Sequence, residues 1–422
     1  MMKNELLKDL EWRGLINDCT DLKALDNFLN EGKISLYCGF DPTADSLHIG
    51  HLLPVLMLRR FQKAGHKPLP LVGGATGYIG DPTGRSEQRQ VNSPEVIAGW
   101  ALKIKNQLSN FLEFEGENPA QMQNNYDWTA NVSMLEFLRE WGKHFNINYM
   151  LGKESVVSRL DHGMTYTEFS YTILQGMDFK ELYERKNCVL QIGGSDQWGN
   201  IVSGLEVIRK TNGPEAKAVG MTLPLVMKSD GTKFGKTSGN AVWLDASKTT
   251  PYEMYQYFIN TADVDVMTFI KYFTFLTRPK IEQLEIAFLA APHERLAQKT
   301  LAKELVCLVH GEAAYEQALK ITQALFSGNI ANLTSDEIAV GFKDVPSALL
   351  NEDLNLVDTL IFTGLAHSKR EAREFITNHA ISVNGTKQND VAFMVESKNA
   401  IDEKFTVIRR GKKNYFLLKH QN

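Results

Sequence analysis

Two short motifs contain side chains whose types and spacing suit them to act on a phosphate. The first is His48-Ile49-Gly50-His51, which directly follows an apolar run, residues 34–40, that we expect to be a buried strand. If a helix begins near Leu47, His48 and His51 share one face of it. Two imidazoles beside a helix N-terminus can donate hydrogen bonds to phosphate oxygens. The order of strand, polar loop and helix start is typical of the place where a doubly wound sheet binds a nucleotide.

The second motif is KFGKT, residues 233–237, and it lies about 185 residues further along the chain. It follows a polar, glycine-bearing stretch, residues 227–232, so we expect Lys233 and Lys236 to be two mobile cations on a loop. Taken alone, each motif has a simpler interpretation. The histidines would be a half-buried pair with satisfied hydrogen bonds, and the lysines would belong to a basic surface loop.

A third group of polar residues has helical spacing. Tyr171, Gln175 and Asp178 fall at positions i, i+4 and i+7, which places them on one stripe of a helix. Apolar neighbours such as Phe169 and Ile173 would pack on another face. The alternative is that Tyr171 and Gln175 are ordinary residues of a helix surface.

The elements needed to hold these residues together follow an α/β pattern between about residues 34 and 226. The short apolar runs ISLYCGF, PLPLVGG and CVLQIGG read as strands, and each is followed by helical periodicity. In a mostly parallel sheet the loops near Gly39, Gly73 and Gly193 would open onto one edge, where ligands bind. From 251 to about 327 the pattern turns helical, and the segment that follows has little periodicity.

Composition limits the possible classes of protein. A chain of 422 residues favours two or three domains, and no run of about 18 apolar residues predicts a membrane span. The N-terminal segment contains acids and no apolar core, which argues against a secretory or transit peptide. The four cysteines form no CxxC pair, so we expect reduced thiols in the cytoplasm and no structural zinc.

Charge is distributed unevenly along the chain. Residues 361–422 contain 11 Lys and Arg against 6 Asp and Glu, a net +5, which leaves −9 for the rest of a chain of net charge −4. Within this segment Lys369, Arg370 and Arg373 fall on the polar face of an expected helix, and Asn384-Gly385 predicts a hairpin turn after 381–383. A basic end on an acidic body suggests RNA contact, although a solvated charged surface is the simpler alternative.

HIGH followed by KFGKT resembles the two signatures of class I aminoacyl-tRNA synthetases. KFGKT differs from the consensus KMSKS at its second, third and fifth positions and keeps both lysines. Four segments, in order along the chain, are similar to the bacterial tyrosyl-tRNA synthetase family: YCGFDPTADSLHIGH, GYIGDPTGR (77–85), FSYTILQGMDF (169–179) and QIGGSDQWGN (191–200).

The resemblance implies a fold class and a domain plan. The fold class would be α/β, with a Rossmann-like doubly wound parallel sheet, then an α-helical domain and a small S4-like α+β RNA-binding domain. The expected boundaries are 1–245 for the catalytic domain, 246–330 for a helical domain that contacts the anticodon stem, 331–352 for a linker and 353–422 for the S4-like domain.

The resemblance also assigns roles to residues. Those for catalysis are Thr43, His48, His51, Lys233 and Lys236. For tyrosine binding, the resemblance implies that Asp81, Tyr171 and Gln175 contact the ammonium group. It implies that Tyr37 and Asp178 contact the phenol hydroxyl and that Gln197 lies near the carboxylate. The residues implied to bind ATP are Gly39, Asp41, His48, His51, Gly194, Asp196 and Lys236. The residues implied to bind RNA are Lys369, Arg370 and Arg373.

The activity implied is that of a tyrosine–tRNA ligase, which uses ATP with Mg²⁺ and charges tRNA(Tyr) as a homodimer. Three alternatives stay open: a tryptophanyl paralogue, an RNA-binding or splicing cofactor that kept the fold, and a nucleotidylyltransferase that does not use tRNA. The pair Tyr37 and Asp178 argues against indole, the intact motifs argue against lost catalysis, and the basic C-terminal segment argues against an enzyme without RNA.

Overall fold

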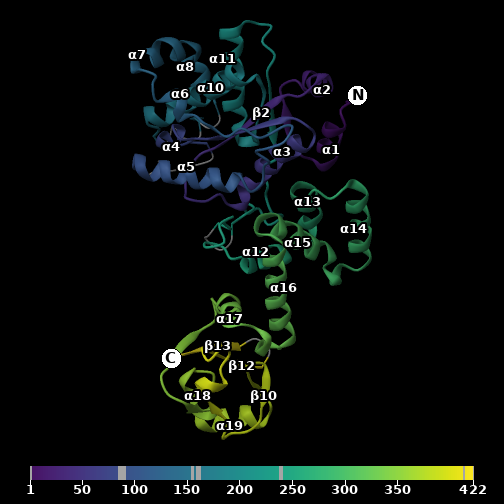
Figure 1. Ribbon diagram of the computed structural model, residues 1–422, viewed down its shortest axis with the longest axis vertical. Helices are drawn as coiled ribbons and strands as arrows, with labels where there is room; N and C mark the ends of the chain where they lie inside the picture. Colours follow the sequence, from purple (N-terminus) through teal and green to yellow (C-terminus); the bar gives the residue numbers. More distant parts are fainter. Residues whose placement is uncertain are drawn as a thin grey trace. The chain divides into compact units, whose positions relative to one another are not determined.

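The computed structural model describes residues 2–83, 92–153, 156–157, 163–236, 241–411 and 414–421. The chain forms two compact units, Met1–Thr249 with Thr261–Leu301, and Thr250–Asn260 with Ala302–Asn422 (Figure 1). Residues of the expected helical domain, 246–330, fall in both units. Its helices α13 (Asp263–Phe273) and α14 (Arg278–Ala290) belong to the first unit, whereas α12 (Pro251–Ile259) packs with α16 (Glu312–Ser327) in the second.

A six-stranded sheet forms the centre of the first unit. Its order is β1-β6-β5-β2-β3-β4, and all neighbours are parallel except β1 with β6. The strands are β1 (Asp18–Cys19), β2 (Ser35–Phe40), β3 (Lys67–Val72), β4 (Gln123–Asn124), β5 (Cys188–Gly194) and β6 (Val219–Leu223). The three strands expected from apolar runs are confirmed, and the sheet is doubly wound as predicted.

The order of the strands fixes where a ligand fits. From β2 the chain first moves outward to β3 and β4, and it later returns through β5 to β6 on the other side. The crevice outside the carboxyl ends of β2 and β5 is therefore the switch point of the sheet, where ligands of open α/β sheets bind.

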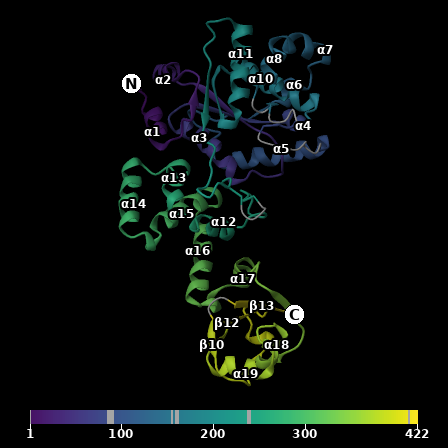
Figure 2. The ribbon, with the colours of Figure 1, turned by 180° about the vertical axis from the view of Figure 1, so that it is seen from behind.

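Helices cover both faces of this sheet. Figures 1 and 2 show α10 (Tyr166–Lys186) and α11 (Trp198–Asn212) on one face, with α3 (Leu52–Lys63) and α5 (Pro94–Leu108) on the other. Tyr37 and Leu69 share a buried core with Phe179 of α10 and Ile208 of α11. Other described helices of the sheet region are α1 (Glu5–Arg13), α2 (Leu22–Glu31), α4 (Thr76–Ile79), α6 (Tyr126–Thr129), α7 (Met134–Glu136) and α8 (Ile147–Leu151).

Two buried arginines hold the C-terminal end of α13. Arg13 of α1 donates from Nη1 to Lys271 O at 3.1 Å, and Arg60 of α3 donates from Nη2 to Thr274 O at 2.6 Å. Cations at a helix C-terminus are stabilised by its exposed carbonyls. Burial, and then the charge of Arg13, lowers the pKa of Arg60 to about 9. Helix α13, which comes after the KFGKT segment in the sequence, is thus fixed to the helix that follows HIGH.

The second unit contains a five-stranded sheet of order β10-β9-β12-β13-β7 and a two-stranded sheet, β11-β8. Its strands are β7 (Ser347–Leu350), β8 (Leu354–Asn355), β9 (Ile381–Val383), β10 (Thr386–Gln388), β11 (Met394–Val395), β12 (Phe405–Arg410) and β13 (Asn414–His420). Besides α12 and α16, it contains α17 (Ser335–Gly341), α18 (Leu356–Phe362) and α19 (Lys369–Thr377), while α15 (Leu296–His310) begins in the first unit. The hairpin turn is confirmed, with Asn384 and Gly385 both at positive φ between β9 and β10.

The segment expected to be a linker, 331–352, is folded. It contains α17 and β7, and a capping box between Thr334 and Glu337 starts the helix. Ile338 and Phe342 are buried in one core with α16 and the strands β12 and β13. Elements of seven and four residues show too little periodicity to be found in a sequence. Among the described residues, no helix is long and apolar enough to cross a membrane.

Candidate active site

The two histidines of HIGH lie together at the switch point. A 3₁₀ turn, Ile49–His51, precedes α3, so the helical segment begins two residues later than expected, and the imidazole rings stack with their centroids 3.9 Å apart. His48 Nδ1 accepts from Gly50 N at 3.0 Å, and His51 Nδ1 accepts from His48 N at 3.2 Å. A neutral imidazole that accepts at Nδ1 carries its proton at Nε2. Each ring therefore has an Nε2–H available as a donor.

Burial keeps both rings neutral. It lowers the pKa of His51 to about 3, with a smaller effect of His48, and it lowers the pKa of His48, with the charge of Lys236 as the next cause. Near neutral pH the pair thus offers hydrogen bonds without positive charge, and the positive charges come from Lys233 and Lys236.

The structure brings the KFGKT segment against HIGH. Ile49 N donates to Val242 O at 2.9 Å, and Val242 N donates to Gly235 O at 2.9 Å. Gly235 has φ +87, and a Cβ there would lie 2.9 Å from Ile49 Cγ1, so glycine fits both the backbone and the space. Lys233 and Lys236 are exposed, and Thr237 lies outside the described residues.

The carboxylate of Asp178 lies at the buried end of the site. Only 2% of Asp178 is exposed. Its oxygens accept from Asn125 Nδ2 at 3.0 Å and from Trp128 Nε1 at 2.9 Å. Burial raises the pKa of Asp178 to about 8, while these two donors oppose the shift. A buried carboxyl group whose pKa is displaced in this way makes its surroundings a candidate functional site.

Hydrogen bonds continue from Asp178 to a second carboxylate. Asn125 Nδ2 also donates to Thr76 Oγ1 at 3.0 Å, and Thr76 donates to Asp41 Oδ1 at 2.6 Å. Tyr171 Oη donates to Asp41 Oδ2 at 2.8 Å. Asp41, predicted for the adenosine half, therefore contacts a residue predicted for the tyrosine ammonium. A Cβ on Gly73 would overlap Asp41 Oδ1, so only glycine leaves room for this network.

A second chain of polar groups lies beside the first. Gln197 Nε2 donates to Asp81 Oδ2 at 2.8 Å, and Gln175 Nε2 donates to Gln197 Oε1 at 3.3 Å. Three residues predicted for tyrosine, from three distant parts of the sequence, are thus in direct contact. The stripe of Tyr171, Gln175 and Asp178 on α10 faces the site, and the alternative of an ordinary helix surface is wrong.

Three buried polar atoms near these groups have no hydrogen-bond partner within the described part of the chain. They are Tyr37 Oη, Gln175 Oε1 and Gln191 Oε1. Tyr37 and Gln191 are paired across β2 and β5, and the charge of Asp178 acts on the pKa of Tyr37, which burial raises above its ordinary value. Buried polar groups are rarely left unpaired, so this arrangement suits a ligand with hydroxyl and amino groups.

The ends of β2 and β5 form the more open half of the site. A Cβ on Gly39 would meet no atom within 4 Å, whereas one on Gly194 would lie 2.5 Å from Asp196 Oδ1. Partial burial and the charge of Asp81 raise the pKa of Asp196, and the charge of Lys233 lowers it. Thr43 is exposed on the same loop as Asp41 and donates from its backbone N to Asp41 O at 2.9 Å.

Sequence reasoning missed the residues that orient Asp178. Thr76, Asn125 and Trp128 are buried, and two of them donate directly to its carboxylate. The only available signal was an Asn and a Trp three positions apart. They follow β4, whose two residues are too few to be recognised as a strand. Gln191 begins the segment QIGGSDQWGN, yet the resemblance assigns it no role.

Within the described ranges, no three His, Cys, Asp or Glu side chains gather closely enough to hold a metal ion. The four cysteines are free.

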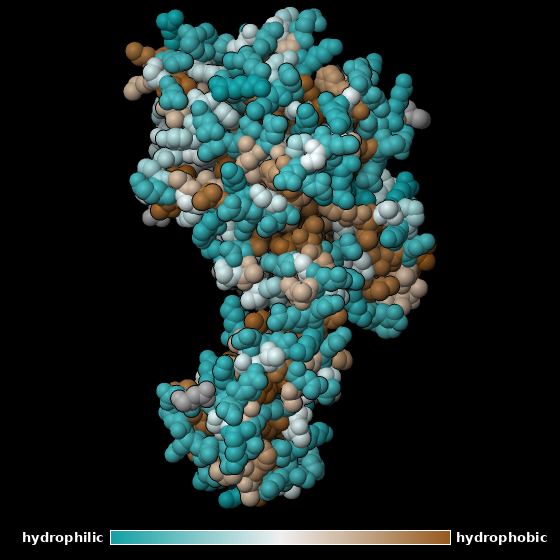
Figure 3. All heavy atoms as spheres, viewed as in Figure 1, coloured by the Kyte–Doolittle hydropathy of each residue, from teal (hydrophilic) through white to brown (hydrophobic). Residues whose placement is uncertain are grey.

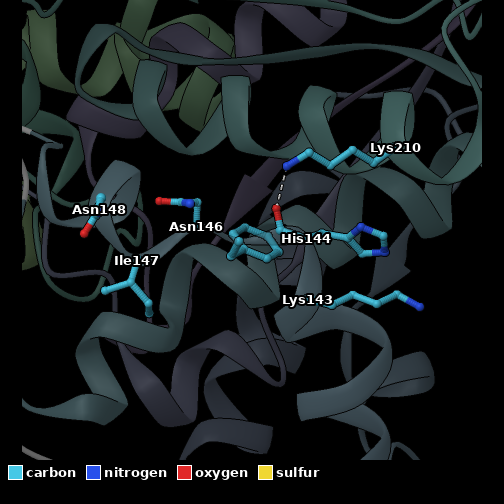
Figure 4. Close-up of a pocket in the computed structure, with 7 residues that line it drawn as sticks. Lys143, His144, Asn146, Ile147, Asn148 and Lys210 are labelled. Carbon is cyan, nitrogen blue, oxygen red and sulfur yellow. Dashed lines mark hydrogen bonds between the residues drawn. The ribbon is translucent and has the colours of Figure 1, made fainter.

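A second hollow lies between α11 and the chain around the start of α8, residues 143–148, and Figure 4 shows its lining. Lys210 Nζ donates to His144 O at 2.7 Å and fixes this segment to α11. Asn146, Ile147 and Asn148 complete the wall, and none of the residues predicted for catalysis or tyrosine lines it.

The sequence of the chain matches the models of two known families. The family of class I tRNA synthetases for tryptophan and tyrosine matches residues 29–327, and the C-terminal domain of tyrosine–tRNA ligases matches residues 337–418. The chain belongs to the tyrosine–tRNA ligase family.

Relatives in this family match along the whole chain. Tyrosine–tRNA ligase 1 of Bacillus anthracis is 58% identical over 417 residues, covering 98% of this chain and 100% of the relative. The tyrosine–tRNA ligase of Geobacillus stearothermophilus is 56% identical over 418 residues, covering 99% and 100%.

Solved structures agree on the fold. A C-terminally truncated mitochondrial tyrosyl-tRNA synthetase of Aspergillus nidulans has a TM-score of 0.68 at 33% identity and covers 77% of this chain and 95% of its own. A tryptophanyl-tRNA synthetase of Encephalitozoon cuniculi has a TM-score of 0.54 at 13% identity and covers 80% and 95%. The latter identity shows a shared fold alone.

We predict that Asp178→Asn flattens the pH dependence of stability. The unfolded chain ionises this carboxyl near its ordinary pKa of 3.8, and the folded chain does so only near 8. Ionisation therefore opposes folding, and this contribution to stability, fully present below about pH 4, is lost as pH rises through about 8. Denaturant unfolding at several pH values measures it. Equal pH slopes for the wild type and the Asn variant would contradict the buried, displaced carboxyl.

Proposed function

We propose that the pocket around Asp178 binds L-tyrosine and that the chain activates it with ATP. Tyrosyl-adenylate and pyrophosphate would form first, and the tyrosyl group would then pass to the 3′ end of tRNA(Tyr). Family membership supports the reaction. The observation that carries the assignment of the pocket is the group of buried polar atoms around Tyr37 and Asp178.

The pocket provides partners for both polar ends of tyrosine. In our proposal the phenol hydroxyl contacts Tyr37 Oη and Asp178, which lie at the buried end. The ammonium lies among Tyr171, Gln175 and Asp81, where the carboxylate of Asp81 and the unpartnered Oε1 of Gln175 can accept its hydrogen bonds. Phenylalanine would leave the groups at the buried end without a partner, which costs free energy.

The activation step requires alignment and charge stabilisation more than proton transfer. The substrate carboxylate is already ionised at neutral pH and attacks the α-phosphorus, and the bond to pyrophosphate breaks. His48 and His51 would donate from Nε2 to phosphate oxygens, and Lys233 and Lys236 would neutralise the departing pyrophosphate. We assign Thr43 to the same phosphate end. Gly39, Gly194 and Asp196 would hold the adenosine, with Asp196 accepting from ribose hydroxyls.

Mg²⁺ would enter with ATP as part of the substrate. The described residues offer no group of ligands for it, so phosphate oxygens and water would hold the ion. We also assign the chain to the cytoplasm, where free thiols such as its four cysteines persist. Recovery from cells in a membrane or secreted fraction would contradict that assignment.

Exchange of pyrophosphate into ATP, measured with each of the 20 amino acids, tests the function. We expect exchange that depends on tyrosine, with tryptophan and phenylalanine far weaker. Asp178→Ala should reduce the preference for tyrosine over phenylalanine by about 10- to 100-fold, the effect of one buried polar group losing its partner. Glu184→Ala changes an exposed carboxylate six residues further along α10, and as the control it should keep the preference. Equal losses for both amino acids would refute the role of Asp178.

The second unit is proposed to bind tRNA through α19. Lys369, Arg370 and Arg373 are exposed on this helix, and Lys369 Nζ lies 2.7 Å from Asp358 Oδ1. Cutting the chain near 333 is a poor test, because it would expose the core that α16 shares with β12 and β13. Substitutions on the exposed face leave that core intact.

The triple variant Lys369→Ala, Arg370→Ala, Arg373→Ala should weaken tRNA binding and leave tyrosine activation unchanged. The slope of log affinity against log salt should flatten by about 0.7–0.9 for every phosphate that these side chains no longer neutralise. A control variant replaces three exposed lysines of the first unit, Lys8, Lys23 and Lys33. Unchanged slope and affinity in the α19 variant would show that this helix does not contact RNA.

We further propose that the chain forms a homodimer through an apolar surface of the first unit. Met134 and Leu135 of α7 are 76% and 78% exposed, and Leu138, Ile147 and Tyr149 nearby in the sequence are about half exposed. Figure 3 shows hydrophobic atoms on the surface where Figure 1 draws α7. Apolar patches of this kind mark interfaces between proteins.

Leu135→Glu combined with Ile147→Glu should shift the protein from dimer to monomer in sedimentation experiments, because burying carboxylates in an interface is costly. Ile286→Glu changes a residue of α14 that is 70% exposed and should not affect assembly. A monomeric wild type, or a variant that remains dimeric, would contradict this surface as the interface.

A further inference from the structure

Asp265, in the first turn of α13, holds the segment that carries the two lysines. Its Oδ1 and Oδ2 accept from Ser229 N at 3.1 and 3.2 Å, and Oδ2 also accepts from Ser229 Oγ at 3.0 Å. The two residues are 36 positions apart in the sequence, and no motif includes Asp265. Asp265 is partly buried, whereas Ser229 is exposed at the tip of the segment.

Hydrogen bonds within the segment from Met227 to Lys233 stabilise its conformation. Lys228 N donates to Thr232 O and Gly231 N donates to Lys228 O, both at 2.9 Å, and Met227 pairs with Lys233 in a short antiparallel bridge. Asp230 Oδ1 accepts from Thr232 N at 2.8 Å. Because these bonds make a tight hairpin, a restraint on its tip is transmitted to the lysine at its base.

The same helix contacts the motif at a second point. Phe234, between the two lysines in the sequence, is buried, and its ring lies 4.8 Å from that of Phe269 and 4.6 Å from that of Phe273. The aromatic contact and the hydrogen bond from Val242 N to Gly235 O hold the base of the hairpin. The contact of Asp265 with Ser229 at the tip adds a second point, and two points on one rigid helix fix the orientation of the hairpin.

In this orientation the charges of the two lysines affect residues of the site. The charge of Lys236 lowers the pKa of His48, and that of Lys233 lowers the pKa of Asp196, so both cations lie within electrostatic reach of residues at the switch point. Gly235 rests against Ile49 of HIGH. The arrangement held by Asp265 is therefore the one that presents the lysines to the phosphates.

We propose that Asp265 is a positioning residue for amino-acid activation. Its hydrogen bonds to Ser229 would hold the hairpin so that Lys233 and Lys236 stay directed at the departing pyrophosphate. This inference rests on the proposed function of the two lysines. Asp265 touches neither substrate, so its effect must appear in the rate of adenylate formation and not in tyrosine binding.

The first test is pre-steady-state kinetics of adenylate formation with the full chain. Asp265→Ala should lower the rate at saturating ATP by about tenfold, comparable to losing a charged hydrogen-bond acceptor, with the dissociation constant for tyrosine unchanged. Asp265→Asn keeps one acceptor oxygen and should recover part of the rate. Ser229→Ala removes one hydrogen bond at an exposed position and serves as the mild second variant should Asp265→Ala fold poorly. Its expected loss is about two- to threefold.

A double-mutant comparison separates positioning from general destabilisation. In a background that carries both Lys233→Ala and Lys236→Ala, Asp265→Ala should lower the rate by much less than it does alone, because both side chains it positions are gone. Full additivity of the two losses would overturn the proposal, as would a wild-type rate in Asp265→Ala.

Limited proteolysis gives a reading that does not depend on activity. Trypsin should cleave after Lys228 and Lys233 faster in Asp265→Ala than in the wild type, while cleavage elsewhere is unchanged. Equal cleavage rates would show that Asp265 does not hold the hairpin in place. If the wild type lacked tyrosine-dependent exchange, the proposed function would fail, yet the proteolysis would still decide whether Asp265 holds the hairpin.

Discussion

Burial of the Asp178 carboxyl group is the constraint around which the buried end of the site is organised. A carboxylate removed from water costs several kcal/mol unless donors are placed around it. Here the donors come from Asn125 and Trp128, which follow β4, while Asp178 itself lies on α10. Since Asn125 must also satisfy Thr76 and the backbone N of Ala75, the same requirement fixes the loop after β3. Three elements are thus held by one network.

The order of strands explains how motifs far apart in the sequence meet. HIGH follows β2, the Asp196 turn follows β5, and these strands are neighbours at the switch point. The KFGKT segment lies after the last parallel strand, and the chain beyond it returns to HIGH through two hydrogen bonds, Ile49 N to Val242 O and Leu244 N to Leu47 O. The two signatures therefore share backbone contacts.

Much of this arrangement could be predicted from sequence, because it depends on patterns that extend over many residues. Three parallel strands are visible as apolar runs, and the polar stripe on α10 is visible as a helical period. The features that were not predicted are short elements or contacts between residues far apart in the sequence. The strand β4 has two residues, α17 has seven, and the contact of Asp265 with Ser229 is a tertiary hydrogen bond with no local signature. The grouping of helices also escaped, since α12 packs with α16 rather than with its neighbours in the sequence.

The two halves of the site rest on separate supports. The network around Asp178 is held by α10 and the loops after β3 and β4, while the lysine-bearing hairpin is held by α13, whose other end is fixed by Arg13 and Arg60. Within the described residues the two supports share no side chain of these networks. A lineage could therefore remodel the deep pocket for another side chain while the half that contains HIGH and the two lysines, which we propose binds the phosphates, remained intact. In an ancestor built this way, new amino-acid specificities could arise by gene duplication without the loss of adenylate chemistry at any intermediate step.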